Sequence, residues 1–185
     1  MHALRNPAGG PRPGTFRMER ELHQQTFMKV RELMTHPAIT CHVNDPLNMA
    51  AHRMWDQDCG ALPVINDDGR VTGMITDRDI CMAAYTQGRS LDAMLVNSAM
   101  ATHVVSCHPE QTILEVEQLM SVHQVRRLPV VDAEGKPLGV ISIDDLAKES
   151  ARPNSRMKQG MAAVTHTLAA ICGPRNGRGA TTDAP

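Results

Sequence analysis

Two short segments of the sequence place a hydroxyl residue and an aspartate at the same spacing, in a pattern that can help to hold an anion. They read G-M-I-T-D-R-D and G-V-I-S-I-D-D, and each places an aspartate three positions after a hydroxyl residue: Asp79 after Thr76, and Asp145 after Ser142. Such pairs are common at helix starts, because the hydroxyl and the carboxylate cap free backbone amides. A helix start also attracts phosphate, and the carboxylate can accept hydrogen bonds from ribose hydroxyls. The pattern fits helix caps and nucleotide-binding corners alike.

The two segments belong to an internal repeat. Eleven identities recur at a constant offset of 66 residues between residues 34–80 and 100–146, without a gap. Repeats of this kind usually bury their apolar faces against each other. Two related halves also form a cleft with pseudo-two-fold symmetry, in which equivalent residues can hold one ligand. We therefore expect a functional site at the boundary between the halves.

Each copy is predicted to fold as β-α-β-β-α, which gives an α/β fold of two repeats packed with pseudo-two-fold symmetry. Apolar residues at helical spacing follow Asp45 and Pro46, so Asp45 is expected to cap a helix that has Pro46 in its first turn. Strands are expected at residues 38–43, 61–65, 71–75, 104–106, 128–131 and 138–141, and further helices at 77–85, 112–123 and 143–150.

The segments that flank the repeats differ in composition. Residues 1–19, with Pro, Gly and Arg, are predicted to be a disordered leader, and residues 174–185 a disordered tail. A short helix within residues 20–34 is expected to pack on the first repeat. Apolar residues at helical spacing predict an amphipathic helix at 154–173, which packs on the module or on a second subunit. The two domains are expected at 28–90 and 95–150.

The composition argues against several classes of function. The formal net charge is -1 and aromatic residues make up 2% of the chain, so no nucleic-acid partner is indicated. No apolar stretch is long enough to span a bilayer, and the N-terminal residues lack the apolar segment of a secretory signal. Five cysteines without C-x-x-C spacing are typical of reduced thiols. We therefore expect a cytoplasmic protein with no membrane partner.

Further candidates occupy equivalent places in the two copies. Thr40 and Ser106 lie on the first predicted strand of each copy, where a polar side chain can form a wall of the cleft. Pro63 and Pro129 lie on the second. Since proline removes a donor from a sheet ladder, it indicates a strand edge or a bend that is open to a ligand.

Arginines distinguish the two copies. Arg78 follows the first corner and adds a guanidinium suited to bidentate contact with phosphate. Arg126 and Arg127 replace Gly60 and Ala61 of the first copy, so the two clefts are expected to differ in charge. An anion would prefer the basic one. The arginine pair fits a solvated rim equally well.

The repeats resemble a tandem pair of CBS domains, a Bateman module, over about residues 28–150. The resemblance rests on the duplicated β-α-β-β-α unit, the Leu-Pro-Val strand, the Asp/Gly turn and the G-h-h-[ST]-x-x-D corner. It implies a regulatory, non-catalytic module that binds AMP, ADP or ATP, and in some members S-adenosylmethionine, between the domains. Such modules form homodimers and act through a regulated protein. The chain is similar to free-standing bacterial members, including hypoxia- and stress-response proteins.

The resemblance also implies roles for individual residues. Hydroxyl groups of Thr76 and Ser142 would contact phosphate, while Asp79 and Asp145 would contact ribose. Ala61 and Arg127 would contact the base or the phosphate. No cofactor is required. With the neighbouring candidates, the expected nucleotide-binding residues are Thr40, Ala61, Pro63, Thr76, Arg78, Asp79, Ser106, Arg126, Arg127, Pro129, Ser142 and Asp145.

A thiol or metal function is a first alternative. Cys41-His42 and Cys107-His108 are equivalent pairs, and thiolate with imidazole could hold zinc if both pairs converged. Adjacent strand residues face opposite sides, so a buried thiol beside a surface histidine is the simpler interpretation, and no metal site is predicted. Redox sensing by a reactive thiol stays open, since the reactivity of a thiol depends on positive charge near it, which lowers its pKa.

A ligand-independent module is a second alternative, in which both corners serve only as helix caps and the chain mediates dimerisation or other protein contacts. Enzyme activity is not expected. The sequence has no G-x-S-x-G, H-E-x-x-H, P-loop or G-x-G-x-x-G motif.

Overall fold

The computed structural model describes residues 28–157 and 160–173. The predictions for residues 1–19 and 174–185, and for most of the helix expected within 20–34, lie outside the described residues. The described part of that last segment forms a 3₁₀ helix, η1 (Val30–Glu32), in place of an α-helix.

The first repeat is a three-stranded sheet with two helices. The strand order is β1-β2-β3, with β1 parallel to β2 and β2 antiparallel to β3. Its elements are β1 (Cys41–His42), α2 (Leu47–Asp56), β2 (Ala61–Ile65), β3 (Val71–Thr76) and α3 (Asp77–Gln87), followed by the 3₁₀ helices η2 (Leu91–Ala93) and η3 (Val96–Ser98). The first strand is shorter than the predicted 38–43.

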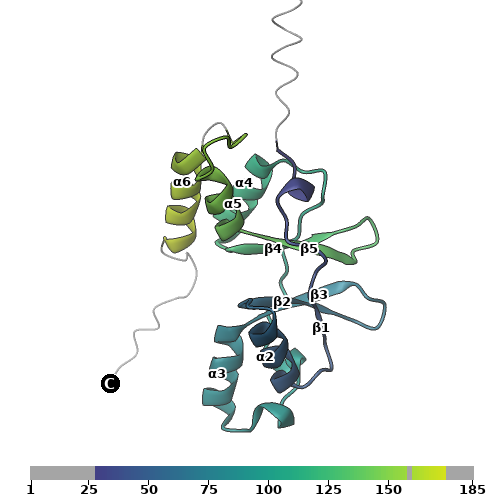
Figure 1. Cartoon of the computed structure of the whole chain (residues 1–185). Coiled ribbons are helices and arrows are strands. Elements are labelled where there is room, and N and C mark those ends of the chain that lie inside the picture. Colours follow the sequence, from purple (N-terminus) through teal and green to yellow (C-terminus); the bar gives the residue numbers. More distant parts are fainter. Residues whose placement is uncertain (1–27, 158–159, 174–185) are drawn as a thin grey trace, which may run out of the picture.

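The second repeat has the same plan with one strand fewer. Its elements are α4 (Ile113–His123), β4 (Arg127–Val131), β5 (Pro137–Ser142) and α5 (Ile143–Ser150), and α6 (Gly160–Cys172) follows. The strand expected at 104–106 is wrong, because only Cys107 forms a bridge, to Val130. The two sheets face each other in the middle of the molecule, with α2 and α3 on one outer side and α4, α5 and α6 on the other (Figure 1).

Each repeat is preceded by a segment that packs into the other repeat. Met28 and Val30 lie in the core of the second repeat, and their equivalents Met94 and Val96 lie in the core of the first. The hydrogen bonds are equivalent too: the Val30 amide donates to Gln111 O (2.9 Å), and the Val96 amide donates to Asp45 O (2.9 Å). The described part of the segment before the first repeat therefore packs on the second repeat, and for these residues the prediction that it packs on the first is wrong.

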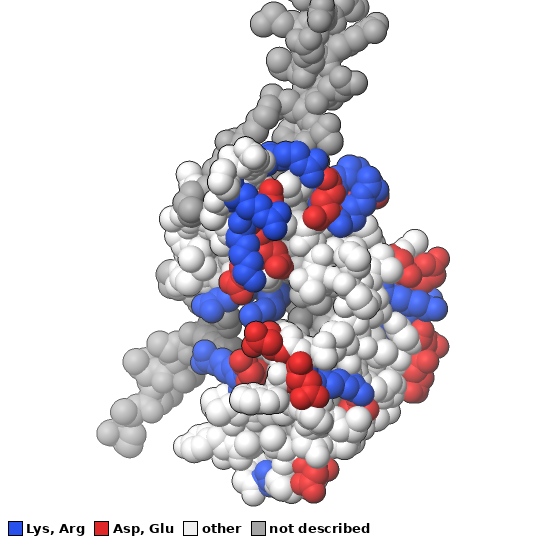
Figure 2. All heavy atoms as spheres, in the orientation of Figure 1, with Lys and Arg blue, Asp and Glu red and all other residues white. Residues whose placement is uncertain are grey.

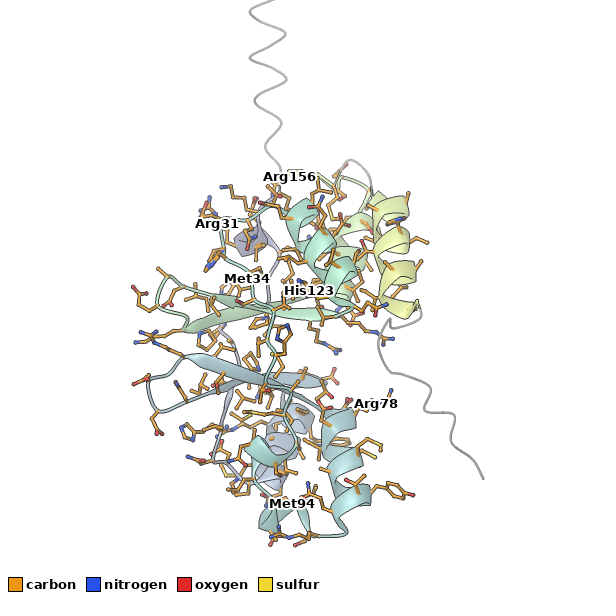
Figure 3. The ribbon with its side chains drawn as sticks, turned by 180° about the vertical axis from the view of Figure 1, so that it is seen from behind. Arg31, Met34, Arg78, Met94, His123 and Arg156 are labelled. Atoms are coloured by element: carbon orange, nitrogen blue, oxygen red, sulfur yellow. The ribbon has the colours of Figure 1, made fainter. Side chains whose placement is uncertain are left out.

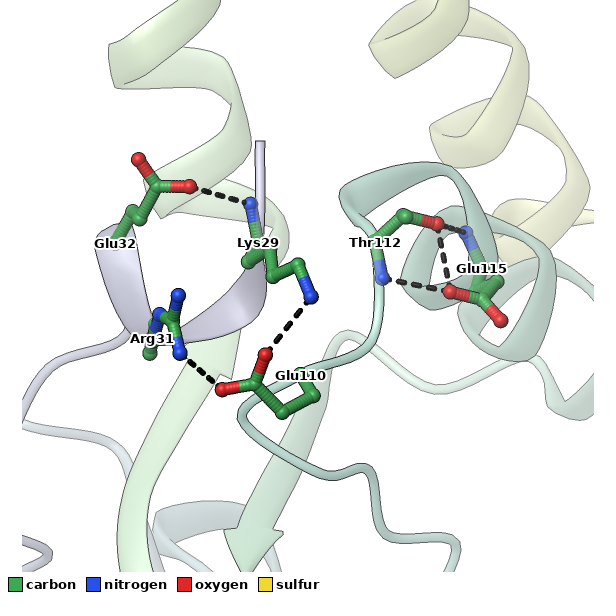
Figure 4. A network of polar contacts seen from close by, with 6 residues as sticks. All are labelled: Lys29, Arg31, Glu32, Glu110, Thr112 and Glu115. Carbon is green, nitrogen blue, oxygen red and sulfur yellow. Dashed lines mark hydrogen bonds and ion pairs between the residues drawn. The ribbon is translucent and has the colours of Figure 1, made fainter. Parts of the chain in front are cut away.

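Ion pairs hold the first of these segments in place. Lys29 Nζ lies 2.8 Å from a Glu110 carboxylate oxygen, and Arg31 pairs with the other oxygen (Figure 4). The hydrogen bond from Lys29, together with the charge of Arg31, lowers the pKa of Glu110. All three side chains are at least partly exposed, so these pairs add little stability and mainly fix the segment's orientation.

Two equivalent glycines allow these segments to cross the sheets. The backbone of Met74 in β3 exchanges hydrogen bonds with Ala101 at 3.0 and 2.9 Å, and Val140 in β5 is bridged to Thr35 in the same way. A Cβ atom on Gly73 would lie 2.6 Å from Met100 Sδ and 3.1 Å from Ala101 O. On Gly139 it would lie 2.6 Å from Thr35 O. Only glycine permits this approach, which draws each strand-to-helix corner against the other repeat.

The predicted cap of α2 does not form. The helix begins after Pro46 without a side-chain cap, and Asp45 Oδ2 instead accepts hydrogen bonds from the His42 amide (2.9 Å) and from Arg53 Nη1 (2.8 Å). A guanidinium offers a charge-assisted bond, which is stronger than a bond to a neutral amide. Arg53 also donates to Thr40 O at 2.9 Å and so holds the chain in front of β1.

Candidate functional site

Both predicted corners form complete capping boxes. In the first, Asp79 Oδ2 accepts hydrogen bonds from the Thr76 amide (2.9 Å) and hydroxyl (2.7 Å), and the Asp79 amide donates to Thr76 Oγ1 (3.2 Å). In the second, the corresponding distances between Ser142 and Asp145 are 2.9, 2.6 and 3.3 Å. Within the described residues, every hydrogen bond that Asp79 accepts uses Oδ2. Its Oδ1 is therefore available to a ligand while the cap stays intact.

One of these corners lines a cleft of about 770 Å³ between the two repeats. That volume is in the range of small-molecule sites. Acidic and basic side chains gather at this boundary on the face shown in Figure 2, and Arg78 lies at the end of α3 nearest the second repeat (Figure 3). The walls are formed by Ala61, Met74, Thr76, Asp77, Arg78, Asp79, Ala101, His103, Val104, Val105, Gln124, Val125, Arg126, Arg127, Ile171, Cys172 and Gly173.

The cleft is rich in cationic groups. Arg78 comes from the first repeat, Arg126 and Arg127 from the second, and all three lie along its walls. Arg127 Nη2 is 3.9 Å from Asp144 Oδ2, at the limit of an ion pair, and Arg126 Nη2 is 4.0 Å from Cys172 Sγ. Neither guanidinium is committed to a short hydrogen bond by these contacts. Within the described residues, Arg126 can exchange its weak contact with Cys172 for a bond to an anion, and Arg127 can likewise exchange its distant pairing with Asp144.

Another part of the wall is apolar and comes partly from an irregular segment. Residues 102–106 have no regular secondary structure and run from the bridge at Ala101 to the bridge at Cys107. Val104 and Val105 of this segment line the cleft together with Met74 of β3 and Val125. Such apolar side chains suit a flat apolar ring, and within the described residues the peptide groups of residues 102–106 form no hydrogen bond, so they can bond a polar group of a ligand.

The twelve predicted binding residues divide into two equal groups. Those that line the cleft are Ala61, Thr76, Arg78, Asp79, Arg126 and Arg127. Those that do not are Thr40, Pro63, Ser106, Pro129, Ser142 and Asp145. Sequence reasoning missed other residues of the wall: Met74, His103, Gln124 and residues 171–173. Gln124 and the equivalent Asp58 both have positive φ, 51° and 47°, but this conformation is visible only in the structure and gives Gln124 no signal in the sequence.

The two prolines do not mark an open edge. Pro63 is buried in β2, which is the middle strand of its sheet, and Pro129 is buried in β4. Pro63 lies opposite Met74, whose backbone groups bond Ala101, so no donor is needed from the proline. The interpretation of Pro63 as a strand edge is wrong, and the burial of both prolines contradicts an opening to a ligand at these positions.

The mirrored corner has a different environment. Arg126 of the cleft is replaced by Gly60 at the equivalent position, and a Cβ atom on Gly60 would lie 3.1 Å from Asp77 Oδ2. The Ser142 and Asp145 corner thus lacks the counterpart of the first arginine. The equivalent of Arg78 is Asp144, so the predicted charge difference between the two sides follows from at least these two positions.

The two cysteines at equivalent positions of the repeats, Cys41 and Cys107, are packed in the cores. Cys41 and Cys107 are 1% and 0% exposed and lie in different cores, and burial raises the pKa of each thiol to about 12. They stay protonated at neutral pH, which argues against redox sensing by these two cysteines. Among residues 28–157 and 160–173, no group of three or more His, Cys, Asp or Glu side chains could hold a metal ion.

The comparison with protein families agrees with the geometry. The model of the CBS domain matches residues 30–85 and again residues 96–152. The chain is a tandem CBS-domain protein. The predicted resemblance and the α/β fold of two CBS repeats are thereby confirmed. In the part of this CBS pair that the structure describes, no helix has the length and apolar character needed to cross a membrane.

Three relatives are similar to this CBS pair in sequence or structure. CBS domain-containing protein YhcV of Bacillus subtilis is 37% identical over 118 residues, which span 64% of this chain and 82% of that protein. The crystal structure of Hypoxic Response Protein I with two coordinated zinc ions is 30% identical, with a TM-score of 0.59, and covers 65% of this chain and 98% of that one. The CBS domain pair of protein MJ0100, in complex with 5'-methylthioadenosine and S-adenosyl-L-methionine, is 25% identical, with a TM-score of 0.59 and the same coverage.

Proposed function

We propose that this CBS pair is a regulatory module without catalytic activity, which binds an adenosine nucleotide in the cleft beside Thr76 and Asp79. One observation carries the proposal: the cleft combines a helix start, a free carboxylate oxygen, three arginines and an apolar wall. These groups suit phosphate, ribose and adenine respectively. The MJ0100 pair, a solved relative, holds two adenosine compounds, which supports this class of ligand.

The charge of the cleft favours AMP, ADP or ATP over S-adenosylmethionine. Three guanidiniums and two carboxylates, those of Asp77 and Asp79, line the cleft, and the phosphate groups of a nucleotide are anionic. S-adenosylmethionine carries a sulfonium cation, which the arginines would repel. We expect affinity to rise from adenosine to AMP to ATP, because each added phosphate is attracted by the arginines. We expect it to fall with added salt, because dissolved ions screen that attraction.

Thermal unfolding and calorimetry with adenosine, AMP, ADP, ATP and S-adenosylmethionine test the proposal. A ligand at one hundred times its Kd should stabilise the protein by about 2.7 kcal/mol. If none of the five raises the unfolding temperature or gives heat of binding, the corners are helix caps alone and the module is independent of ligands. The complete capping boxes give that second function its support.

We also propose that two copies meet through the first repeat. Trp55 of α2 and Tyr85 of α3 are 87% and 83% exposed, although both are large aromatic side chains. In the second repeat the position equivalent to Trp55 is Ser121, which lines the groove beneath α6. Since α6 covers that helix within one chain, a second copy is the natural cover for α2 and α3. Light scattering should give a dimer, and Trp55→Ser with Tyr85→Ala a monomer; a monomeric parent protein would contradict the proposal.

The cysteines and a relative of known name suggest where the protein acts and in which response. We infer a cytoplasmic protein, since all five cysteines are free thiols, and a stress-related role in keeping with the name of Hypoxic Response Protein I. A regulated protein would respond to the ligand-dependent arrangement of the repeats. Pull-down with and without ATP from hypoxic and aerated cells would identify such a partner; equal recovery under all conditions would argue against it.

A further inference from the structure

The last helix of the chain reaches the ligand cleft. Helix α6 packs along α4 and α5, with Val164 and Ile171 buried in the core of the second repeat. Its C-terminal end points toward the boundary between the repeats (Figure 1). Ile171, Cys172 and Gly173 form part of the cleft wall. The helix is therefore both a cover of the second repeat and a neighbour of any ligand.

Two residues of the cleft hold this helix end. Gln124 Nε2 donates hydrogen bonds to Ala170 O (3.1 Å) and to Gly173 O (3.2 Å), which lie in the last turn of α6 and just after it. Gln124 itself ends α4 in the left-handed conformation and lines the cleft. Arg126, two positions later, directs Nη2 to Cys172 Sγ at 4.0 Å. The contacts that hold α6 thus come from the wall that would meet a ligand.

The helix end resembles an anion in its charge. Backbone carbonyls at a helix C-terminus have no partner within the helix and carry a partial negative charge equivalent to about half an electron. Here that end lies beside Arg126, in the cleft that Arg127 and Arg78 also line. A phosphate group at the same place would compete for the guanidinium and would be repelled by the carbonyls. Ligand and docked helix therefore oppose each other.

A buried carboxyl group beneath α6 weakens its docking. Glu117 of α4 is 6% exposed, and within the described residues its Oε1 has no hydrogen-bond partner. It lines a groove between α4 and α6 together with His166 and Thr167. Burial raises the pKa of Glu117. An unpaired buried acid is costly, and release of α6 would return it to water.

From these contacts we infer that α6 is an autoinhibitory element of the CBS pair. Its last turn and an anionic nucleotide compete for Gln124 and Arg126, so nucleotide binding releases α6 and uncovers α4 and α5 for the regulated protein. The inference rests on the proposed nucleotide site. By reciprocity, anything that loosens α6 tightens nucleotide binding by the same factor.

Two substitutions in the full chain test this without touching the cleft. Val164→Ala removes a buried anchor of α6, and Glu117→Gln removes the acid beneath it; neither residue lines the cleft. Calorimetry with AMP and ATP should show binding on the order of fivefold tighter for Val164→Ala and weaker for Glu117→Gln. Hydrogen exchange of the amides of α6 should become faster in wild type when ATP is added.

The outcomes separate this inference from the proposed function. Nucleotide binding with equal affinity in all three proteins, or slower exchange of α6 with ATP, would overturn the autoinhibition alone. Binding by Val164→Ala but not by wild type would support it strongly. No binding by any of the three proteins would overturn the nucleotide site and the autoinhibition together.

Discussion

Replacing Asp79 by alanine separates the two roles that its carboxylate can have. The side chain caps α3 through Oδ2, and loss of such a cap costs about 1 kcal/mol of stability. In a domain pair of this size that lowers the unfolding temperature by roughly 2–4 °C. If the same carboxylate also accepts two hydrogen bonds from ribose, each about 1.5 kcal/mol because the acceptor is charged, nucleotide affinity falls by about 3 kcal/mol, on the order of 100-fold.

A third capping box supplies the matched control. Glu115 Oε2 accepts from the Thr112 amide (2.6 Å) and hydroxyl (2.7 Å) at the start of α4, in the same geometry and outside the cleft (Figure 4). Glu115→Ala should lower the unfolding temperature as Asp79→Ala does, yet bind ATP as tightly as wild type in calorimetry. Equal ATP affinity in Asp79→Ala and Glu115→Ala would show that Asp79 is a cap alone and does not contact the nucleotide.

Three further predictions address the cleft, the crossing segments and the buried acid. Arg126→Gln should weaken ATP more than AMP and reduce the dependence of affinity on salt, as measured by calorimetry; unchanged salt dependence would place the phosphates elsewhere. Gly73→Ala should lower the free energy of unfolding in urea by about 2 kcal/mol, because its Cβ atom would overlap Met100 Sδ; a neutral effect would show that the segment yields easily. Since burial raises the pKa of Glu117, the folded protein holds this proton more tightly than the unfolded chain, and the stability it contributes is lost as pH rises above the ordinary value of 4.5. Glu117→Gln should therefore be more stable than wild type at pH 7, with the difference shrinking toward pH 4.5; a constant difference would contradict the assignment.

The sequence predicted the repeated parts of the molecule well. The offset of 66 residues and the periodicity of apolar residues place most helices and strands, and both corners form at Thr76 and Ser142 as expected. These features depend on residues close in the chain, whose local preferences agree with the fold. The strand expected at 104–106 failed because residues 102–106 pair with no strand, and the one bridge here, from Cys107 to Val130 of the same repeat, lies just after them.

Features set by long-range packing could not be read in the same way. Val30 and Val96 are apolar and fit either core, so nothing in their composition shows that each crosses to the other repeat. Asp45 follows the rule for a helix cap, yet Arg53, eight residues later, captures its carboxylate. The end of α6 at the cleft depends on Gln124, whose side chain carries no motif.

A crystal structure of the protein grown with ATP is the sharpest test of the nucleotide site. We expect density for one nucleotide between the repeats, with ribose hydroxyls on Asp79 Oδ1, phosphate at the Thr76 corner near Arg126, and adenine against Val104 and Met74. Nucleotide density outside that cleft, or a cleft that holds solvent alone at saturating ATP, would contradict it.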